Sequence, residues 1–155
     1  MTCAESRELS TDSRVKVEEN GRVAVFINED RARFHKVKLD DGVVKGELCA
    51  DFAVLKESVG VVIVELKGTD IEHAVDQVEA AIELMKKCDR PLEKKGRASA
   101  IPFAGLIVCS RYPKSDTSFQ KKQKKFVAKH KAPLHCVSGR GEFKLEKVLR
   151  FDGPR

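Results

Sequence analysis

The feature that most constrains the fold is the apolar run at 61–66, which opens with four consecutive β-branched residues. Such a run without polar alternation is typical of a strand that is covered on both faces, so we expect it at the centre of a sheet. Asp70 follows as a helix cap, and apolar side chains recur at helical spacing from there to about Lys87. A buried strand followed by an amphipathic helix predicts an α/β fold.

Shorter β-rich runs, separated by turn-forming residues, predict further strands at 15–17, 23–27, 34–39, 43–44, 50–55, 104–109 and 134–137. A second helix is predicted at 115–131, a loop at 89–102 and an amphipathic segment at 142–151. We therefore expect a mixed central β-sheet flanked by helices, opened by an N-terminal β-meander. Residues 15–155 would form a single domain, preceded by a flexible tail at 1–14.

Charge is distributed unevenly along the chain. Residues 1–90 hold 14 Lys and Arg against 19 Asp and Glu, whereas residues 91–155 hold 16 against 5. An acidic half attracts divalent cations and a basic half attracts phosphates, so this polarity favours a protein that acts on nucleic acid through a metal. The alternative is that the charges only solvate the surface.

Five scattered cysteines with no C-x-x-C pair argue against a disulfide scaffold. No apolar run approaches the roughly 20 residues that span a bilayer, and the first residues lack an apolar signal core. We expect a soluble, cytoplasmic protein with no membrane partner.

Asp51, Glu65 and Lys67 form the strongest candidate site. Side chains alternate along a strand, so Glu65 and Lys67 share a face, and Asp51 lies beside them if the strands at 50–55 and 61–66 pair antiparallel. Two close carboxylates favour a cation between them, and hard oxygen ligands suit Mg²⁺ or Mn²⁺. Such a site is equipped for phosphodiester hydrolysis, with the lysine offsetting negative charge. The plain alternative is a structural salt bridge.

The Glu-x-Lys triplet alone carries little information, because this chain repeats it at 93–95 and 142–144. Only the copy at 65–67 closes an apolar strand, follows a strand that opens with an aspartate and precedes a capped helix. That context distinguishes it from the others.

The segments CADFAVLKESVGVVIVELKG and DIEHAVDQVEAAIEL together resemble the PD-(D/E)XK, or restriction endonuclease-like, nuclease superfamily, with Ala50-Asp51 in place of the family's Pro-Asp. The resemblance implies that Asp51, Glu65 and the Leu66 backbone carbonyl bind Mg²⁺ and that Lys67 supports the attacking water. Gln77 resembles the glutamine of RecB-like members, although Ala81 stands where their tyrosine is expected. The alternative for Gln77 is a hydrogen bond from the helix to nearby backbone.

An additional acid from an N-terminal helix is part of the family pattern, and no such helix is evident here. Glu19 or Glu29 could take its place. A zinc cluster of Cys109, Cys136 and neighbouring histidines has no support from spacing, because a cysteine on an apolar strand is usually part of the core.

Cations in the second half of the chain are the candidates for phosphate contact, in and before the helix predicted at 115–131. They are Arg111, Lys114, Lys121, Lys122, Lys124 and Lys125. The first hypothesis is thus a Mg²⁺-dependent DNA endonuclease of restriction, defence, recombination or repair, acting as a homodimer or inside a larger assembly. The alternative is a catalytically inactive module that binds nucleic acid or a partner protein through the same fold.

Overall fold

The computed structural model describes residues 7–67, 70–87, 101–110, 117–139 and 141–154, and it describes the backbone alone for Lys67 and Thr117. Within these ranges the chain is mixed α/β, with nine strands and three helices. In chain order they are β1 (Arg7–Ser10), β2 (Arg14–Glu19), β3 (Arg22–Ile27), β4 (Phe34–Lys38), β5 (Phe52–Lys56), β6 (Gly60–Lys67), α1 (Ile71–Lys87), β7 (Phe103–Cys109), α2 (Thr117–His130), β8 (Leu134–Ser138), β9 (Gly141–Phe143) and α3 (Leu145–Val148).

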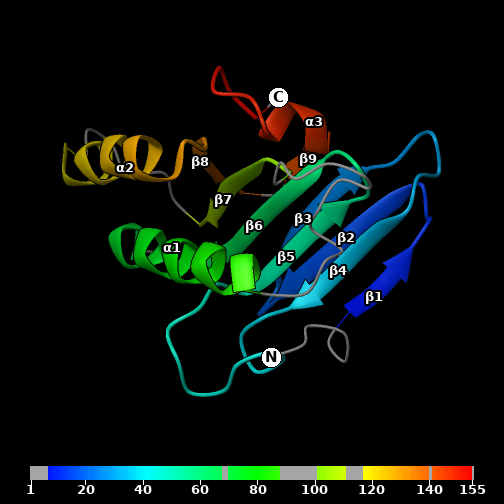
Figure 1. Cartoon of the computed structure of the whole chain (residues 1–155), viewed down its shortest axis with the longest axis horizontal. Coiled ribbons are helices and arrows are strands. Elements are labelled where there is room, and N and C mark those ends of the chain that lie inside the picture. Colours follow the sequence, from blue (N-terminus) through cyan, green and yellow to red (C-terminus); the bar gives the residue numbers. More distant parts are fainter. Residues whose placement is uncertain (1–6, 68–69, 88–100, 111–116, 140, 155) are drawn as a thin grey trace.

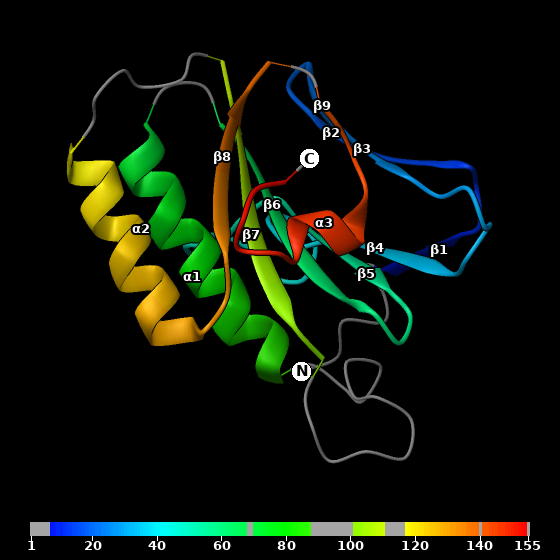
Figure 2. The same cartoon turned by 90° about the horizontal axis from the view of Figure 1, so that it is seen from above.

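A six-stranded mixed sheet forms the centre of the molecule, in the order β1-β4-β5-β6-β7-β8 (Figure 1). The strands from β1 to β6 pair antiparallel, and β6, β7 and β8 run parallel. Helices α1 and α2 cover one face of this sheet (Figure 2). The other face is covered by α3 and by a three-stranded sheet of β2, β3 and β9.

Strand β6 lies in the interior of the sheet, between β5 and β7, as its apolar run predicts. Val61 and Ile63 pack into the core on the side of α1 and α2, whereas Val62 and Val64 pack into the core on the other side. All four side chains are fully buried. Because both faces of β6 are covered, no polar position interrupts the run until Glu65.

Helix α1 begins and ends as its sequence predicts. The Asp70 carboxylate accepts a hydrogen bond from the His73 N–H at 3.1 Å, which satisfies one of the free donors of the first turn. Lys86 and Lys87 occupy the last turn, where cations suit the helix dipole. The predicted apolar stripe is buried, comprising Ile71, Ala74, Val75, Val78, Ala81, Ile82 and Met85. No helix in the described ranges is long and apolar enough to cross a membrane.

The predicted N-terminal β-meander is wrong. Strands β2 and β3 form a hairpin, but the chain then leaves that sheet, and β4 joins the six-stranded sheet instead. The segment at 43–44 forms a turn with an isolated bridge from Val44 to Asp40, where a strand was expected. Turn residues mark where the chain reverses, but they do not determine which sheet the next strand enters.

The flexible tail predicted at 1–14 does not hold for residues 7–10, which form β1 and pair with β4. Residues 1–6, and residues 89–100 of the predicted loop, lie outside the described ranges. At the other end of the chain, the amphipathic segment at 142–151 divides into β9 and α3, and Leu145 and Val148 of α3 are buried beneath the six-stranded sheet.

Candidate active site

Asp51 and Glu65 lie next to each other on neighbouring strands. The predicted antiparallel pairing of β5 and β6 is confirmed, and its register places Phe52 opposite Val64. Asp51, one residue before β5, therefore faces Glu65 across the ladder. Glu65 follows Val61 and Ile63 on the face that α1 covers, because side chains alternate along a strand.

Two hydrogen bonds connect Asp51 to β6, one with Glu65 and one with Leu66. The Asp51 N–H donates to Oε1 of Glu65 at 3.1 Å, and Oδ2 of Asp51 accepts from the Leu66 N–H at 2.8 Å. Beyond Phe52, β5 no longer pairs with β6, while β6 continues beside β7 as far as Lys67. The Asp51 carboxylate thus takes the hydrogen bond that a continuing β5 would have made, and it lies against the backbone of Leu66.

The site is electrostatically negative and largely dry. Glu65 is 2% exposed. Burial raises the pKa of Asp51, and the nearby carboxylates of Glu19 and Asp40 raise it further, against the opposing effect of hydrogen bonds with Leu66 N–H and Glu65. Burial, with the negative charge around it, also raises the pKa of the Cys49 thiol to about 11. Such a potential favours a cation.

Glu19, and not Glu29, lies near this site. Glu19 ends β2 of the small sheet, and its Oε2 is 3.7 Å from Nζ of Lys38, the cross-strand partner of Phe52. Glu29 lies near the far end of β5, where it pairs with Lys144 at 3.9 Å in a pocket that Lys56 also lines. That end is roughly 16 Å from Asp51 along the strand.

Asp40 is the acid that the sequence analysis missed. It raises the pKa of both Asp51 and Cys49, so its charge acts on the same place as theirs. Asp40 belongs to a turn that precedes the loop leading into β5, so its place in the sequence gives no sign of a role in the site. The backbone hydrogen bond from Leu39 N–H to the Asp51 carbonyl, at 2.9 Å, brings this turn back to the site.

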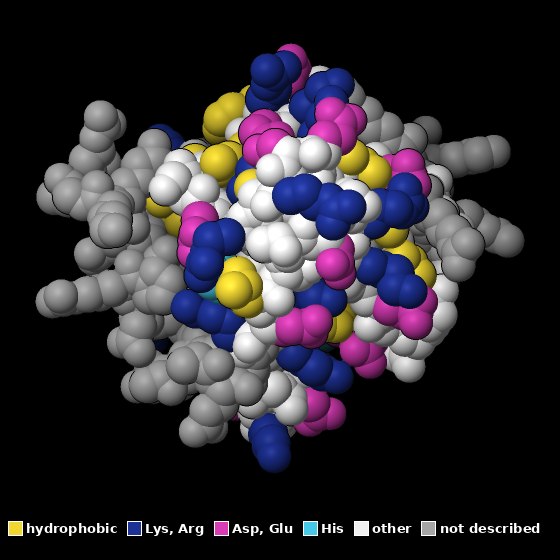
Figure 3. All heavy atoms as spheres, turned by 90° about the vertical axis from the view of Figure 1, so that its right-hand side faces the viewer, with side chains coloured by type: hydrophobic (Ala, Val, Ile, Leu, Met, Phe, Trp, Pro, Cys, Tyr) yellow, Lys and Arg dark blue, Asp and Glu magenta, His cyan; other side chains and the backbone are white. Residues whose placement is uncertain are grey.

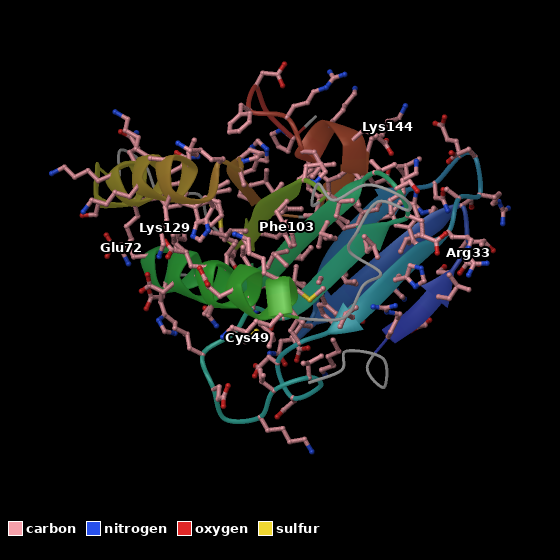
Figure 4. The ribbon with its side chains drawn as sticks, in the orientation of Figure 1. Arg33, Cys49, Glu72, Phe103, Lys129 and Lys144 are labelled. Atoms are coloured by element: carbon pink, nitrogen blue, oxygen red, sulfur yellow. The ribbon has the colours of Figure 1, made fainter. Side chains whose placement is uncertain are left out.

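Gln77 reaches the site from α1 through the backbone. Its Nε2 donates to the Cys49 carbonyl at 3.3 Å, and Figure 4 shows Cys49 next to that helix. Its Oε1 is buried without a hydrogen-bond partner in the described part of the chain. Gln77 therefore holds the segment just before Asp51 against α1, which agrees with the backbone hydrogen bond foreseen for it. His73, one turn earlier, is exposed.

Lys67 continues β6 and has Cys109 of β7 as its register partner, so its backbone is placed two residues after Glu65. Its side chain lies outside the described structure. The described residues contain no group of three or more His, Cys, Asp or Glu arranged as metal ligands. Asp51 and Glu65 still supply two hard oxygen donors beside the Leu66 backbone, a donor set that suits Mg²⁺ or Mn²⁺.

The predicted phosphate-binding cations differ in their surroundings. Lys122 ties α2 to α1, because its Nζ lies 3.2 Å from the Glu72 carbonyl and 3.2 Å from both carboxylate oxygens of Asp76. Lys129 similarly pairs with Glu79 at 3.4 Å, between the two helices (Figure 4). Among the predicted cations, Lys121, Lys124 and Lys125 are exposed on α2. Arg111 and Lys114 lie outside the described ranges.

The face on the right-hand side of Figure 1 carries both charge signs. Lys and Arg side chains alternate there with Asp and Glu side chains (Figure 3). Ion pairs such as Arg33 with Glu57 at 3.1 Å and Lys36 with Glu8 at 3.6 Å belong to the strands of this region. A face of mixed sign offers a polyanion no continuous positive track, in contrast to the run of exposed lysines on α2.

The cysteines and histidines of the second half do not assemble a zinc cluster. The sulfurs of Cys109 and Cys136 lie 3.7 Å apart on neighbouring strands. His135, however, has its Nε2 2.8 Å from the Val148 carbonyl, and Nε2 of His130 lies 3.6 Å from Glu79. The His135 imidazole is therefore held against α3, whereas Nε2 of His130 is buried without a hydrogen-bond partner among the described residues, and burial raises the pKa of the Cys136 thiol.

Two carboxylates and a strand backbone at the carboxyl edge of a sheet could hold a divalent cation and an anionic substrate together. The candidate site is therefore an arrangement of this chain's own residues, and its chemistry must be inferred from them. No protein-family model, curated protein or solved structure matches this chain.

Proposed function

We propose that this chain is a metal-dependent nuclease of the restriction endonuclease-like type, which hydrolyses phosphodiester bonds in DNA at Asp51, Glu65 and Lys67. The observation that carries the proposal is the contact between Asp51 and Glu65 across β5 and β6, with the Asp51 carboxylate on the Leu66 N–H. Two carboxylates held this close favour a divalent cation bound to both, and their hard oxygen atoms suit Mg²⁺ or Mn²⁺.

The order of elements supports the same proposal. A central strand carries Glu-x-Lys at its carboxyl end, an amphipathic helix follows, and the chain returns through β7 parallel to β6. This is the order that the resemblance to the PD-(D/E)XK superfamily implies. The copy at 142–144 does not share this setting, because Glu142 lies on β9 at the edge of the small sheet, and the copy at 93–95 lies outside the described residues.

In the proposed site, Asp51, Glu65 and the Leu66 carbonyl hold Mg²⁺, or Mn²⁺ in its place. The bound cation would supply a water of lowered pKa and neutralise charge on the phosphate. Lys67 would orient that water and stabilise charge on a phosphate oxygen. Gln77 keeps the segment before Asp51 against α1, which preserves the distance between the two carboxylates.

The test is cleavage of supercoiled plasmid and of single-stranded DNA, with and without Mg²⁺ or Mn²⁺. The variants are Asp51→Asn and the pair Glu65→Gln with Lys67→Ala. The chain offers a matched control in its other Glu-x-Lys triplet, as Glu142→Gln with Lys144→Ala. That control removes the same two charges from the same spacing, far from the candidate site.

We expect metal-dependent cleavage by the wild type and by the control, and a loss of at least about 100-fold in the two site variants, as is typical when a charge-stabilising group is removed. Cleavage that survives in the site variants contradicts the proposal. A wild type that binds DNA without cutting it favours the alternative, an inactive binding module on the same fold. Native mass spectrometry of the complex would show whether one or two copies act on a duplex.

A further inference from the structure

Arg22 belongs to the small sheet, yet it lies at the end of the large sheet where the candidate site is found. Its Nε donates to Oγ of Ser110 at 3.2 Å. Ser110 follows Cys109, which is the register partner of Lys67. Figure 2 shows the turn between β2 and β3 at the same end of the molecule as the carboxyl ends of β7 and β8. By strand spacing, the guanidinium of Arg22 lies on the order of 10 Å from the Lys67 backbone.

The tight hairpin and the buried residues that follow it fix the position of the Arg22 backbone. Asn20 and Gly21 form a two-residue turn with positive φ at both positions, 50° and 79°, a backbone typical of tight hairpins. Glu19 and Arg22 close that turn as a cross-strand pair. The next residues of the hairpin are anchored, because Ala24 and Phe26 are fully buried against the face of the large sheet.

Arg22 has no ion-pair partner among the residues that the structure describes. Its cross-strand neighbour Glu19 lies instead beside Lys38. A guanidinium offers five donors in a planar fork, and the bond from Nε to Ser110 leaves the two terminal amino groups for other acceptors. Carboxylate and phosphate groups both match the geometry of that fork, and on the proposed DNA substrate the available group is phosphate.

We propose that Arg22, positioned by Ser110, binds a backbone phosphate of the DNA next to the one being cleaved. This inference rests on the proposed nuclease function for its location, and it adds a substrate class, namely a polynucleotide with at least two phosphates. The hairpin between β2 and β3 then forms one wall of the substrate site, on the side of the sheet opposite α1.

The test measures the binding of a fluorescent 20-nucleotide strand and of its duplex by anisotropy in Ca²⁺, at several salt concentrations. The variants are Arg22→Gln, Arg22→Lys and Ser110→Ala. Arg14→Gln is the matched control, because Arg14 begins β2 at the opposite end of the same hairpin and pairs with Glu142. Thermal melting shows that each variant is folded.

We expect Arg22→Gln to weaken binding about tenfold, as for one lost charged hydrogen bond, and to reduce the salt slope by about one. Arg22→Lys should keep the salt slope, and Ser110→Ala should weaken binding less than Arg22→Gln. With Mg²⁺, Arg22→Gln should raise KM for the oligonucleotide.

The inference is overturned if Arg22→Gln binds DNA with the same affinity and the same salt slope as Arg14→Gln. It is also overturned if the wild type binds neither the single strand nor the duplex. Binding is measured without cleavage, so the two proposals fail separately. A chain that binds through Arg22 but never cuts would retain the phosphate contact and lose the nuclease function.

Discussion

Asp51 and Glu65 occupy positions that a chain selected only for stability would not give to carboxylates. Glu65 is buried between two strands, and Asp51 lies beside it with Glu19 and Asp40 near enough to raise its pKa. Hydrogen bonds from the backbone offset part of this cost. Destabilisation of this kind, caused mainly by burial of Asp51 and then by the neighbouring carboxylates, concentrates at functional sites, because a cation that binds there relieves it.

Replacing Asp51 by Asn should therefore stabilise the metal-free protein while removing activity. Because the folded pKa of Asp51 is raised, the folded chain keeps this proton over a pH range in which the unfolded chain has lost it. The free energy of unfolding consequently falls as the pH rises above 3.8. At pH 8 we expect Asp51→Asn to melt about 2–4 °C higher for each kcal/mol by which the buried, ionised carboxylate destabilises the fold, and the difference should shrink near pH 4.

Differential scanning fluorimetry in EDTA and in Mg²⁺ measures this effect. Mg²⁺ should raise the melting temperature of the wild type and leave Asp51→Asn unaffected, because only the wild type binds it. Asp12→Asn is the control, since Asp12 is an exposed aspartate near the other end of β2. A lower melting temperature for Asp51→Asn than for the wild type in EDTA would show that the carboxylate is stabilising.

His135 should make folding sensitive to mild acid. Burial lowers its pKa, against the opposing effect of the Val148 and Arg150 backbone, and its Nε2 lies 2.8 Å from the Val148 carbonyl. As the pH falls below 6.5, the unfolded chain takes up a proton that the folded chain does not, so stability is lost. Urea midpoints between pH 7.5 and 5 should fall less in His135→Gln than in the wild type. Equal slopes in the two proteins would refute this role, and His73→Gln provides an exposed control.

Strands and helices whose apolar residues follow a clear pattern were predicted correctly from the sequence. Those whose structure depends on pairing with other strands were not. The apolar run of β6 and the apolar stripe of α1 are both buried in the core, so the sequence alone was enough to predict that strand and that helix. Strand β1 has no such pattern, because its residues are exposed or half-buried and its strand structure comes from pairing with β4. The separation of β3 from β4 likewise depends on which core each strand covers, which local sequence does not specify.

Gly105 is required where β7 passes beneath α1. A methyl group there would lie 2.6 Å from Cδ1 of Leu134 and 2.8 Å from Cγ1 of Val78. We expect Gly105→Ala to lower the free energy of unfolding by about 1–3 kcal/mol, as overpacked cores do. Chemical denaturation measures this, and adding Leu134→Val, which removes one of the clashing groups, should recover part of the loss. If the double variant is no more stable than Gly105→Ala alone, the contact with Leu134 is not the source of the strain.

Strand β1 should protect the edge of the large sheet. Removing residues 1–10 would expose β4, and unpaired strand edges associate with other chains. We expect a loss of about 2 kcal/mol, the value of a few hydrogen bonds at about 1 kcal/mol each, and earlier elution from size-exclusion chromatography. Glu8→Pro, compared with Glu8→Ala, tests the same pairing in the full-length chain, since proline cannot donate a backbone hydrogen bond. A truncated chain that melts and elutes like the wild type would show that β1 contributes nothing.

Across the whole molecule, the site draws on parts of the chain that sequence reasoning could not bring together. The contact of Asp51 with Glu65 followed from alternation and from one antiparallel turn, so it was predictable. Glu19 was one of two open candidates, and Arg22 was not considered, because both come from the second sheet, whose docking depends on tertiary packing. The basic second half of the sequence likewise provides fewer free cations than its composition suggests, because Lys122 and Lys129 pair with acidic side chains on α1.

That difference among the lysines of α2 leads to a test of where DNA lies on the molecule. Lys121 and Lys125 are exposed one helical turn apart, whereas Lys122 is tied to Asp76. If α2 follows the phosphate backbone, Lys121→Gln with Lys125→Gln should weaken DNA binding and reduce the salt slope by about one per contact. Lys122→Gln should instead lower the melting temperature and leave that slope unchanged. The control is Lys16→Gln with Lys147→Gln, which removes the same net charge from β2 and α3. If the two double variants have equal salt slopes of DNA binding, only the overall charge matters and α2 is not the binding face.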